Sequence, residues 1–104
     1  MIEEEVQEID GFKVGDIVTA YSDGYHRITK IFKRTPEQGD FIGMEIRAYV
    51  HYQPLLFANG KESHKKEAGC DISFCKHALL AIDEEIKNLE SIRNKILELQ
   101  FDSK

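Results

Sequence analysis

The sequence predicts an α+β fold, in which a small antiparallel β-barrel or curled sheet precedes one long C-terminal helix. Short β-branched and aromatic segments between residues 12 and 57 are separated by Gly, Pro and Asn-Gly turn signals. After residue 78 the apolar residues recur every three or four positions, as on one side of a helix. The chain has 104 residues, which is the size of a single domain.

We expect three regions along the chain: an acidic N-terminal arm over residues 1–10, the barrel over residues 11–72, and an amphipathic helix over residues 73–101. The arm carries five acidic residues and no basic one, with little periodicity. It is therefore expected to be frayed or extended.

The first hairpin is predicted from two β-branched segments, residues 17–21 and residues 25–32. Asp and Gly in the intervening residues 22–24 tolerate the left-handed conformations that a tight turn needs. Ile28 and Ile31 are three residues apart rather than two. If both are buried, the second strand must contain a bulge or a sharp coil between them.

A long strand is predicted over residues 41–52, after a Pro- and Gly-containing loop at residues 35–40. Its apolar face contains Ile42, Met44, Ile46, Ala48, Val50 and Tyr52, and its polar face contains Glu45, Arg47, Tyr49 and His51. Pro54 should turn the following segment into an edge strand or a bend. Asn59-Gly60 predicts a hairpin turn, after which residues 61–68 form an edge strand or a loop.

The C-terminal helix is predicted from one apolar stripe, for which Ser73 or Asp71 could cap the start. Part of the stripe fits a heptad, with Ile82, Leu89 and Ile96 at one core position and Ile92 and Leu99 at the other, although Glu85 interrupts the second row. A helix over residues 76–100 would be ~37 Å long, which exceeds the width of a barrel of this size.

Two arrangements of this helix are open: it lies across the sheet, or it extends beyond it and pairs with a copy of itself. We expect the second, which makes the protein a homo-oligomer, either a dimer or a larger assembly. The residues expected at that interface are Ile82, Ile86, Leu89, Ile92, Ile96 and Leu99.

The run Val14-Gly15-Asp16-Ile17-Val18, followed by Gly24, Ile28 and Ile31, resembles the opening hairpin of SH3-like small β-barrels of the KOW and Tudor type. The resemblance covers residues 12–75 and implies a small barrel. His26 and Arg27 stand where KOW motifs usually place a second Gly. The nucleic-acid role of that family is therefore not carried over.

The net charge of −5 is unevenly distributed along the chain. The net charge of the acidic arm equals the net charge of the whole protein. Residues 11–34, in contrast, carry five basic and two acidic side chains. The basic residues are Lys13, Arg27, Lys30, Lys33 and Arg34. The net negative charge of the protein disfavours general binding to phosphate backbones, but a basic face can still bind along a phosphate backbone. The alternative is that these charges are the solvated face of a hairpin.

Catalytic and metal-binding motifs are weak. His64, Cys70, Cys75 and His77 are zinc-ligand types, but their spacing differs from the usual zinc motifs, so we expect no metal. The two Cys are expected to be ordinary thiols in a reducing, cytoplasmic compartment. There is no phosphate-binding glycine loop, and Asp83, Glu84 and Glu85 suit the start of a helix. We expect no enzymatic activity and no cofactor.

The candidate binding surface combines aromatic and basic side chains: Tyr21, Tyr25, Arg27, Lys30, Lys33, Arg34, Tyr49 and His51. Aromatic residues beside Arg are typical of protein-binding hot spots and of base-stacking surfaces. The alternative is that the tyrosines only cover an open end of the barrel.

Three functions fit these features. The first is a non-catalytic module that binds and inhibits a partner protein, as small viral or accessory proteins do in the host cytoplasm. The second is a nucleic-acid-binding barrel that uses the basic hairpin. The third is a protein that binds or sequesters a small anionic ligand such as a nucleotide. No apolar run approaches the length of a membrane span and no secretory signal is present, so we expect no membrane association.

Overall fold

The computed structural model describes residues 2–21, 24–35 and 48–102, and the side chains of these residues up to 100. It contains a six-stranded antiparallel sheet, a small two-stranded ladder and one C-terminal helix, which confirms the α+β class. The elements are β1 (Ile2–Val6), β2 (Glu8–Ile9), β3 (Phe12–Lys13), β4 (Ile17–Ala20), β5 (Tyr25–Thr35), β6 (Ala48–Leu56), β7 (Ala68–Asp71), the 3-10 helix η1 (Ile72–Phe74), β8 (Cys75–His77) and α1 (Ala78–Asp102).

The long strand β5 organises the sheet. The strand order is β7-β6-β5-β4-β8, and β1 pairs with the end of β5 that β4 does not reach. The described sheet is open, because no ladder joins its two outer strands β7 and β8. The pairing of β5 with β6 shifts register between Ile28 and Lys30, while Ile28 and Ile31 are 1% and 0% exposed. The predicted bulge is therefore confirmed.

The core lies on one face of this sheet. It consists of Val18, Ala20, Ile28, Ile31, Ala48, Val50, Tyr52, Cys70 and Ile72. The alternation predicted for the long strand is confirmed in its second part, where Ala48, Val50 and Tyr52 are buried and Tyr49 and His51 lie on the other face. Residues 41–47 of that prediction lie outside the described residues.

Pro54 does not end the strand, so the bend that was one of the two predictions for this position is absent. Pro54 is buried within β6 and lies opposite His26 of β5. The ladder between β6 and β7 covers only residues 49–52, so the missing N–H of Pro54 interrupts no bond of that ladder. The Asn59-Gly60 turn is confirmed, since the Gly60 amide donates to the Phe57 carbonyl at 2.9 Å and Gly60 has φ +84°.

The first part of the acidic arm is extended, which is one of the two alternatives expected for it, and it forms a paired strand. Residues 2–6 pair antiparallel with residues 31–35 of β5, which places Glu3 opposite Arg34 and Glu4 opposite Lys33. The apolar pattern gives no sign of this strand, because Glu3, Glu4 and Glu5 are all exposed. Cross-strand charge complementarity supplies the physical reason for the pairing.

The helix begins later than the predicted residue 73. Asp71 does act as a cap, but for η1, where its carboxylate accepts from the Ser73 amide at 2.8 Å. Residues 75–77 then form β8, which pairs with β4, and α1 starts at Ala78. The extended segment pairs with β4 because the edge of that strand offers hydrogen-bonding groups that a helical turn would leave unused.

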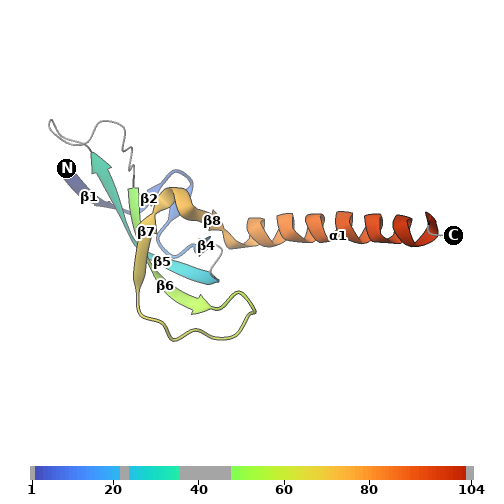
Figure 1. The fold of residues 1–104 in the computed structure, drawn as a ribbon. Helices are drawn as coiled ribbons and strands as arrows, with labels where there is room; N and C mark the ends of the chain where they lie inside the picture. The colour runs from blue at the N-terminus through green and yellow to red at the C-terminus, as the bar shows by residue number, and fades with distance from the viewer. Residues whose placement is uncertain (1, 22–23, 36–47, 103–104) are drawn as a thin grey trace.

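The helix projects away from the sheet instead of lying across it (Figure 1). The molecule measures 67 × 34 × 20 Å and has a radius of gyration of 18.6 Å. A compact chain of this length has a radius of gyration of about 13 Å. In the described part of the chain, no helix combines the length and apolarity needed to cross a bilayer.

Candidate functional site

The face of the sheet opposite the core carries an aromatic and basic group that we call the outer cluster: Phe32, Arg34, Tyr49 and His51. Strand pairing places Phe32 opposite Tyr49 and Lys30 opposite His51. The Arg34 guanidinium lies 4.5 Å from the centre of the Tyr49 ring, as in a cation–π contact. The His51 ring meets Phe32 edge-on at 5.3 Å and Tyr49 at 5.5 Å.

Gly69 of β7 makes room for this cluster. A Cβ atom at Gly69 would lie 2.6 Å from Cε1 of Tyr49, so the Tyr49 ring lies directly over the Gly69 backbone. Sequence reasoning missed Gly69 and Phe32. The signal for Phe32 is its spacing of two residues from Arg34 on the same strand, beyond the bulge. No sequence signal identifies Gly69.

Acidic residues of β1 and of the segment before β7 reduce the positive charge of this face. Arg34 Nε lies 2.9 Å from Oε1 of Glu3, and His51 Nδ1 lies 3.4 Å from Oε1 of Glu67. On the opposite face of the sheet, Lys33 is likewise placed opposite an acidic residue, Glu4, in the β1–β5 ladder. The predicted basic face is therefore largely charge-balanced, which is unlike the positive stripe of a typical phosphate-binding surface.

The other predicted binding residues are separated from the outer cluster. Lys33 is next to Arg34 along β5 and so points to the opposite face. Tyr21 stacks on Phe74 of η1 at 4.5 Å, and its φ of +55° turns the chain at the end of β4. Arg27 is exposed on β5 opposite Gln53, before the bulge. The predicted binding surface is thus divided, and Lys30, Arg34, Tyr49 and His51 are the members that lie together.

Tyr25 contributes instead to a groove of about 660 Å³ between the first turns of α1 and the ends of β4 and β6, which we call the basal groove. Its walls are mainly apolar and include Ile17, Tyr25, Leu56, Leu79 and Ile82. Asp16 and His77 supply polar side chains to its lining.

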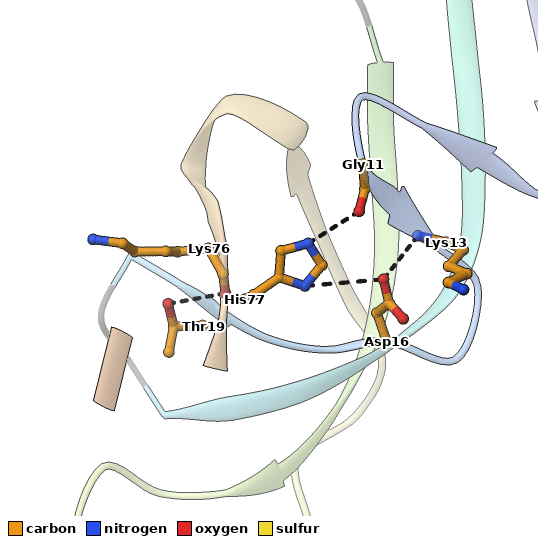
Figure 2. A network of polar contacts seen from close by, with 6 residues as sticks. All are labelled: Gly11, Lys13, Asp16, Thr19, Lys76 and His77. Carbon is orange, nitrogen blue, oxygen red and sulfur yellow. Dashed lines mark hydrogen bonds and ion pairs between the residues drawn. The ribbon is translucent and has the colours of Figure 1, made fainter. Parts of the chain in front are cut away.

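Asp16 and His77 belong to a polar network that fastens β8 to the N-terminal turns (Figure 2). His77 Nε2 lies 3.0 Å from the Gly11 carbonyl oxygen, and the His77 ring stacks on Phe12 at 4.4 Å. The Asp16 carboxylate accepts from the Lys13 amide at 3.0 Å, but lies 4.0 Å from His77 Nδ1. That distance is too long for a hydrogen bond, so each side chain is held mainly by its backbone partner, Lys13 for Asp16 and Gly11 for His77.

The two cysteines approach each other across the outer strands. Cys70 Sγ of β7 lies 3.8 Å from Cys75 Sγ of β8, and both thiols are free. The hydrogen bond from Cys75 lowers the pKa of Cys70, whereas the same bond and burial raise the pKa of Cys75. His77 is engaged with Gly11, and within residues 2–21, 24–35 and 48–102 no group of three or more His, Cys, Asp or Glu side chains is placed to hold a metal ion.

The residues predicted for oligomerisation lie along the projecting helix. Together with Leu79 they form the helix stripe: Leu79, Ile82, Ile86, Leu89, Ile92, Ile96 and Leu99. Ile82 is half-buried at the basal groove, and the other six are between 44% and 77% exposed. Leu80 and Leu97 are exposed as well, although the heptad did not include them.

No family model matches the chain, and no curated protein or solved structure is significantly similar to it. The function must therefore be inferred from the outer cluster, the basal groove and the helix stripe.

Proposed function

We propose that the protein is a non-catalytic interaction module that associates with itself through α1 and binds a partner protein through the outer cluster. The observation that carries this proposal is the exposure of the helix stripe on a helix of 25 residues. Such an exposed apolar row is rare on a monomer and marks an association surface.

The energetics support association. Most helices in proteins are stabilised by packing of their apolar face, because helix formation in water is only marginally favourable. Burying one Leu or Ile side chain contributes about 1.5–3 kcal/mol. Most of α1 lies beyond the sheet, so this stabilisation must come from another molecule (Figure 1). A second copy of the chain carries an identical stripe and can supply this stabilisation as the protein concentration rises.

The outer cluster supports protein binding. Tyr and Arg are the side chains most often found at the centre of protein interfaces. Here Arg34 is stacked on Tyr49 and paired with Glu3, so its position is fixed before a partner arrives. A preorganised, charge-balanced surface favours a folded protein with mixed charges over a polyanion. The nucleic-acid alternative receives less support for the same reason.

The resemblance to SH3-like barrels extends this proposal to the fold. We propose that the sheet is a variant of that barrel which remains open between β7 and β8. The hairpin β4–β5, the bulge in β5 and the close approach of Cys70 and Cys75 on the two outer strands support this relationship.

Light scattering of a stripe variant tests the self-association. Leu89→Glu combined with Ile96→Glu should produce monomers, because both carboxylates enter the apolar interface. Ser91→Glu combined with Asn94→Glu adds the same charge away from the stripe and should leave the assembly intact. A wild-type monomer at high concentration, or a stripe variant that keeps the wild-type mass, would refute self-association through α1.

A further inference from the structure

The helix stripe has the same spacing in both directions along the chain. Its seven members are separated by three, four, three, three, four and three residues, and Leu89 is the central one. A stripe with this symmetry matches a copy of itself that runs in the opposite direction about a two-fold axis at Leu89. The axis places Leu79 opposite Leu99 of the second copy, Ile82 opposite Ile96, and Ile86 opposite Ile92.

A parallel pair would also bring apolar residues together, so the charges decide between the two directions. Glu85 occupies the core position that Ile92 and Leu99 hold in the two following heptads. In a parallel pair the two Glu85 carboxylates would therefore face each other within the interface, which is unfavourable for like charges.

In the antiparallel pair, Glu85 and a second acidic residue each lie opposite a basic residue of the other copy. The axis at Leu89 places Glu85 opposite Arg93 of the second copy, and Asp83 opposite Lys95. The acidic residues 83–85 and the basic residues Arg93 and Lys95 are all exposed in the single chain. Charge complementarity between the two halves of α1 thus favours the antiparallel direction.

The basal groove continues the same stripe. Leu79 and Ile82 line both the stripe and the groove, beside Ile17 and Leu56 of the sheet. In the antiparallel pair, Ile96 and Leu99 of the second copy lie against Leu79 and Ile82, at the mouth of this groove. Gln100 of the second copy is then level with Ala78, so the incoming helix ends where the sheet begins.

We infer that α1 pairs antiparallel with α1 of a second copy about a two-fold axis at Leu89, and that the C-terminal turn of the second copy covers the basal groove. This inference rests on the self-association proposed above and adds the direction of pairing and the occupant of the groove.

Disulfide cross-linking separates the direction of pairing from association itself. Single Cys residues are introduced into a chain in which Cys70 and Cys75 are replaced by Ala. Leu89→Cys lies on the axis and cross-links to itself in either direction, so it reports association alone. Ile82→Cys cross-links to itself only in a parallel pair. A refolded mixture of Ile82→Cys and Ile96→Cys forms a mixed dimer only in an antiparallel pair.

The expected result is a covalent dimer for Leu89→Cys, no dimer for Ile82→Cys alone, and a mixed dimer for the pair of variants. Self-cross-linking of Ile82→Cys would overturn the antiparallel direction and leave self-association intact. Absence of every cross-link would refute both. If the Cys-free background does not fold, the native thiols are kept, since Cys70 is 3% exposed, and the linked positions are identified by mass spectrometry.

Two further variants test the groove and the charges. A mixture of Ile17→Cys and Leu99→Cys should cross-link if the second copy's last turn covers the groove, and its failure beside a positive Ile82–Ile96 link would overturn the groove occupant alone. Glu85→Arg should weaken dimerisation about tenfold, and adding Arg93→Glu in the same chain should restore it. An unrestored double variant would argue against the pairing of Glu85 with Arg93.

Discussion

Arg34 and Glu3 form an ion pair between β5 and β1, with Nε 2.9 Å from Oε1. Among the described strands, the pair joins the most basic one to the most acidic one, so each strand reduces the net charge of the other. Both side chains keep contact with solvent, at 21% and 49% exposure. The contribution of the pair to stability should be below about 1 kcal/mol, and its main effect is on the surface potential.

Neutralising the acidic residues of β1 should therefore create an affinity for DNA that the wild-type chain is expected to lack. Glu3→Gln combined with Glu4→Gln removes two negative charges from beside Arg34 and Lys33. We expect this variant to bind duplex DNA at low salt and to lose that binding steeply as salt increases. Glu62→Gln combined with Glu90→Gln makes the same change in net charge elsewhere. Fluorescence anisotropy measures both, and steep salt-dependent binding by the wild-type chain would favour the nucleic-acid function.

Gly24 should tolerate no side chain. An added Cβ would lie 2.3 Å from the Leu56 carbonyl oxygen, and Gly24 has φ +108°. Gly24→Ala should lower the free energy of unfolding by about 2–4 kcal/mol, because both the backbone contact and the left-handed conformation are unfavourable. Gly60→Ala is the matched control, with φ +84° and no atom within 4 Å of the added Cβ. It should cost about 1 kcal/mol in urea unfolding. Equal costs would contradict the close approach at Gly24.

The outer cluster should depend on Gly69. Gly69→Ala forces the Tyr49 ring away from its position over β7, and this movement also breaks the contact with Arg34. We expect a small loss of stability, since the ring lies near the surface and can rotate. The loss of partner binding should match that of Tyr49→Ala. In a double-mutant cycle the two substitutions should not be additive. Additive losses would show that Gly69 acts independently of Tyr49.

His77 should stabilise the fold through stacking and one hydrogen bond. His77→Phe keeps the contact with Phe12 and removes the bond to the Gly11 carbonyl, so it should cost about 1 kcal/mol. His77→Ala removes both interactions and should cost more. The two variants are compared by urea unfolding. If His77→Phe is the more destabilising of the two, ring stacking contributes nothing at this position.

The cysteines should be independent of metal. A structural zinc ion would contribute about 10 kcal/mol or more, so a chelator would unfold a zinc-dependent domain. We expect the melting temperature to be unchanged by a chelator, with Cys75→Ser tolerated better than the buried Cys70→Ser. Cys75→Ala should also raise the pKa of Cys70, because it removes the hydrogen bond that stabilises the Cys70 thiolate. The pH dependence of thiolate absorbance measures this shift, and an unchanged midpoint would contradict the bond.

Local sequence patterns predicted most of the helices and strands of this fold, but not all of the pairings between strands. The bulge in β5 follows from the spacing of Ile28 and Ile31, and the Asn59-Gly60 turn follows from its dipeptide. The β1–β5 pairing has no such signal, because Glu3, Glu4 and Glu5 give β1 no apolar face. The short β8 is likewise set by its pairing with β4, a tertiary contact that overrides local propensity.

The candidate surface was predicted in part for the same reason. Alternation along β6 placed Tyr49 and His51 on the face that faces away from the core, as the structure has it. Lys33 and Arg34 were both assigned to one candidate surface, yet adjacent strand residues point to opposite faces. Glu3 and Glu67 join the surface from segments that are distant in sequence from β5, so pattern reading along one segment cannot find them.

The length of α1 sets the distance between the two sheets of the proposed dimer. A helix of 25 residues is about 37 Å long, and in an antiparallel pair it holds the two sheets at opposite ends of a rod. Each dimer then presents two outer clusters, one on the sheet at each end of this rod. Such a dimer gains avidity only on a target whose binding sites repeat at a matching interval. It cannot engage two sites at once when they are closer together. The stiff arm would therefore make the protein selective for the spacing of its partners as well as for their chemistry.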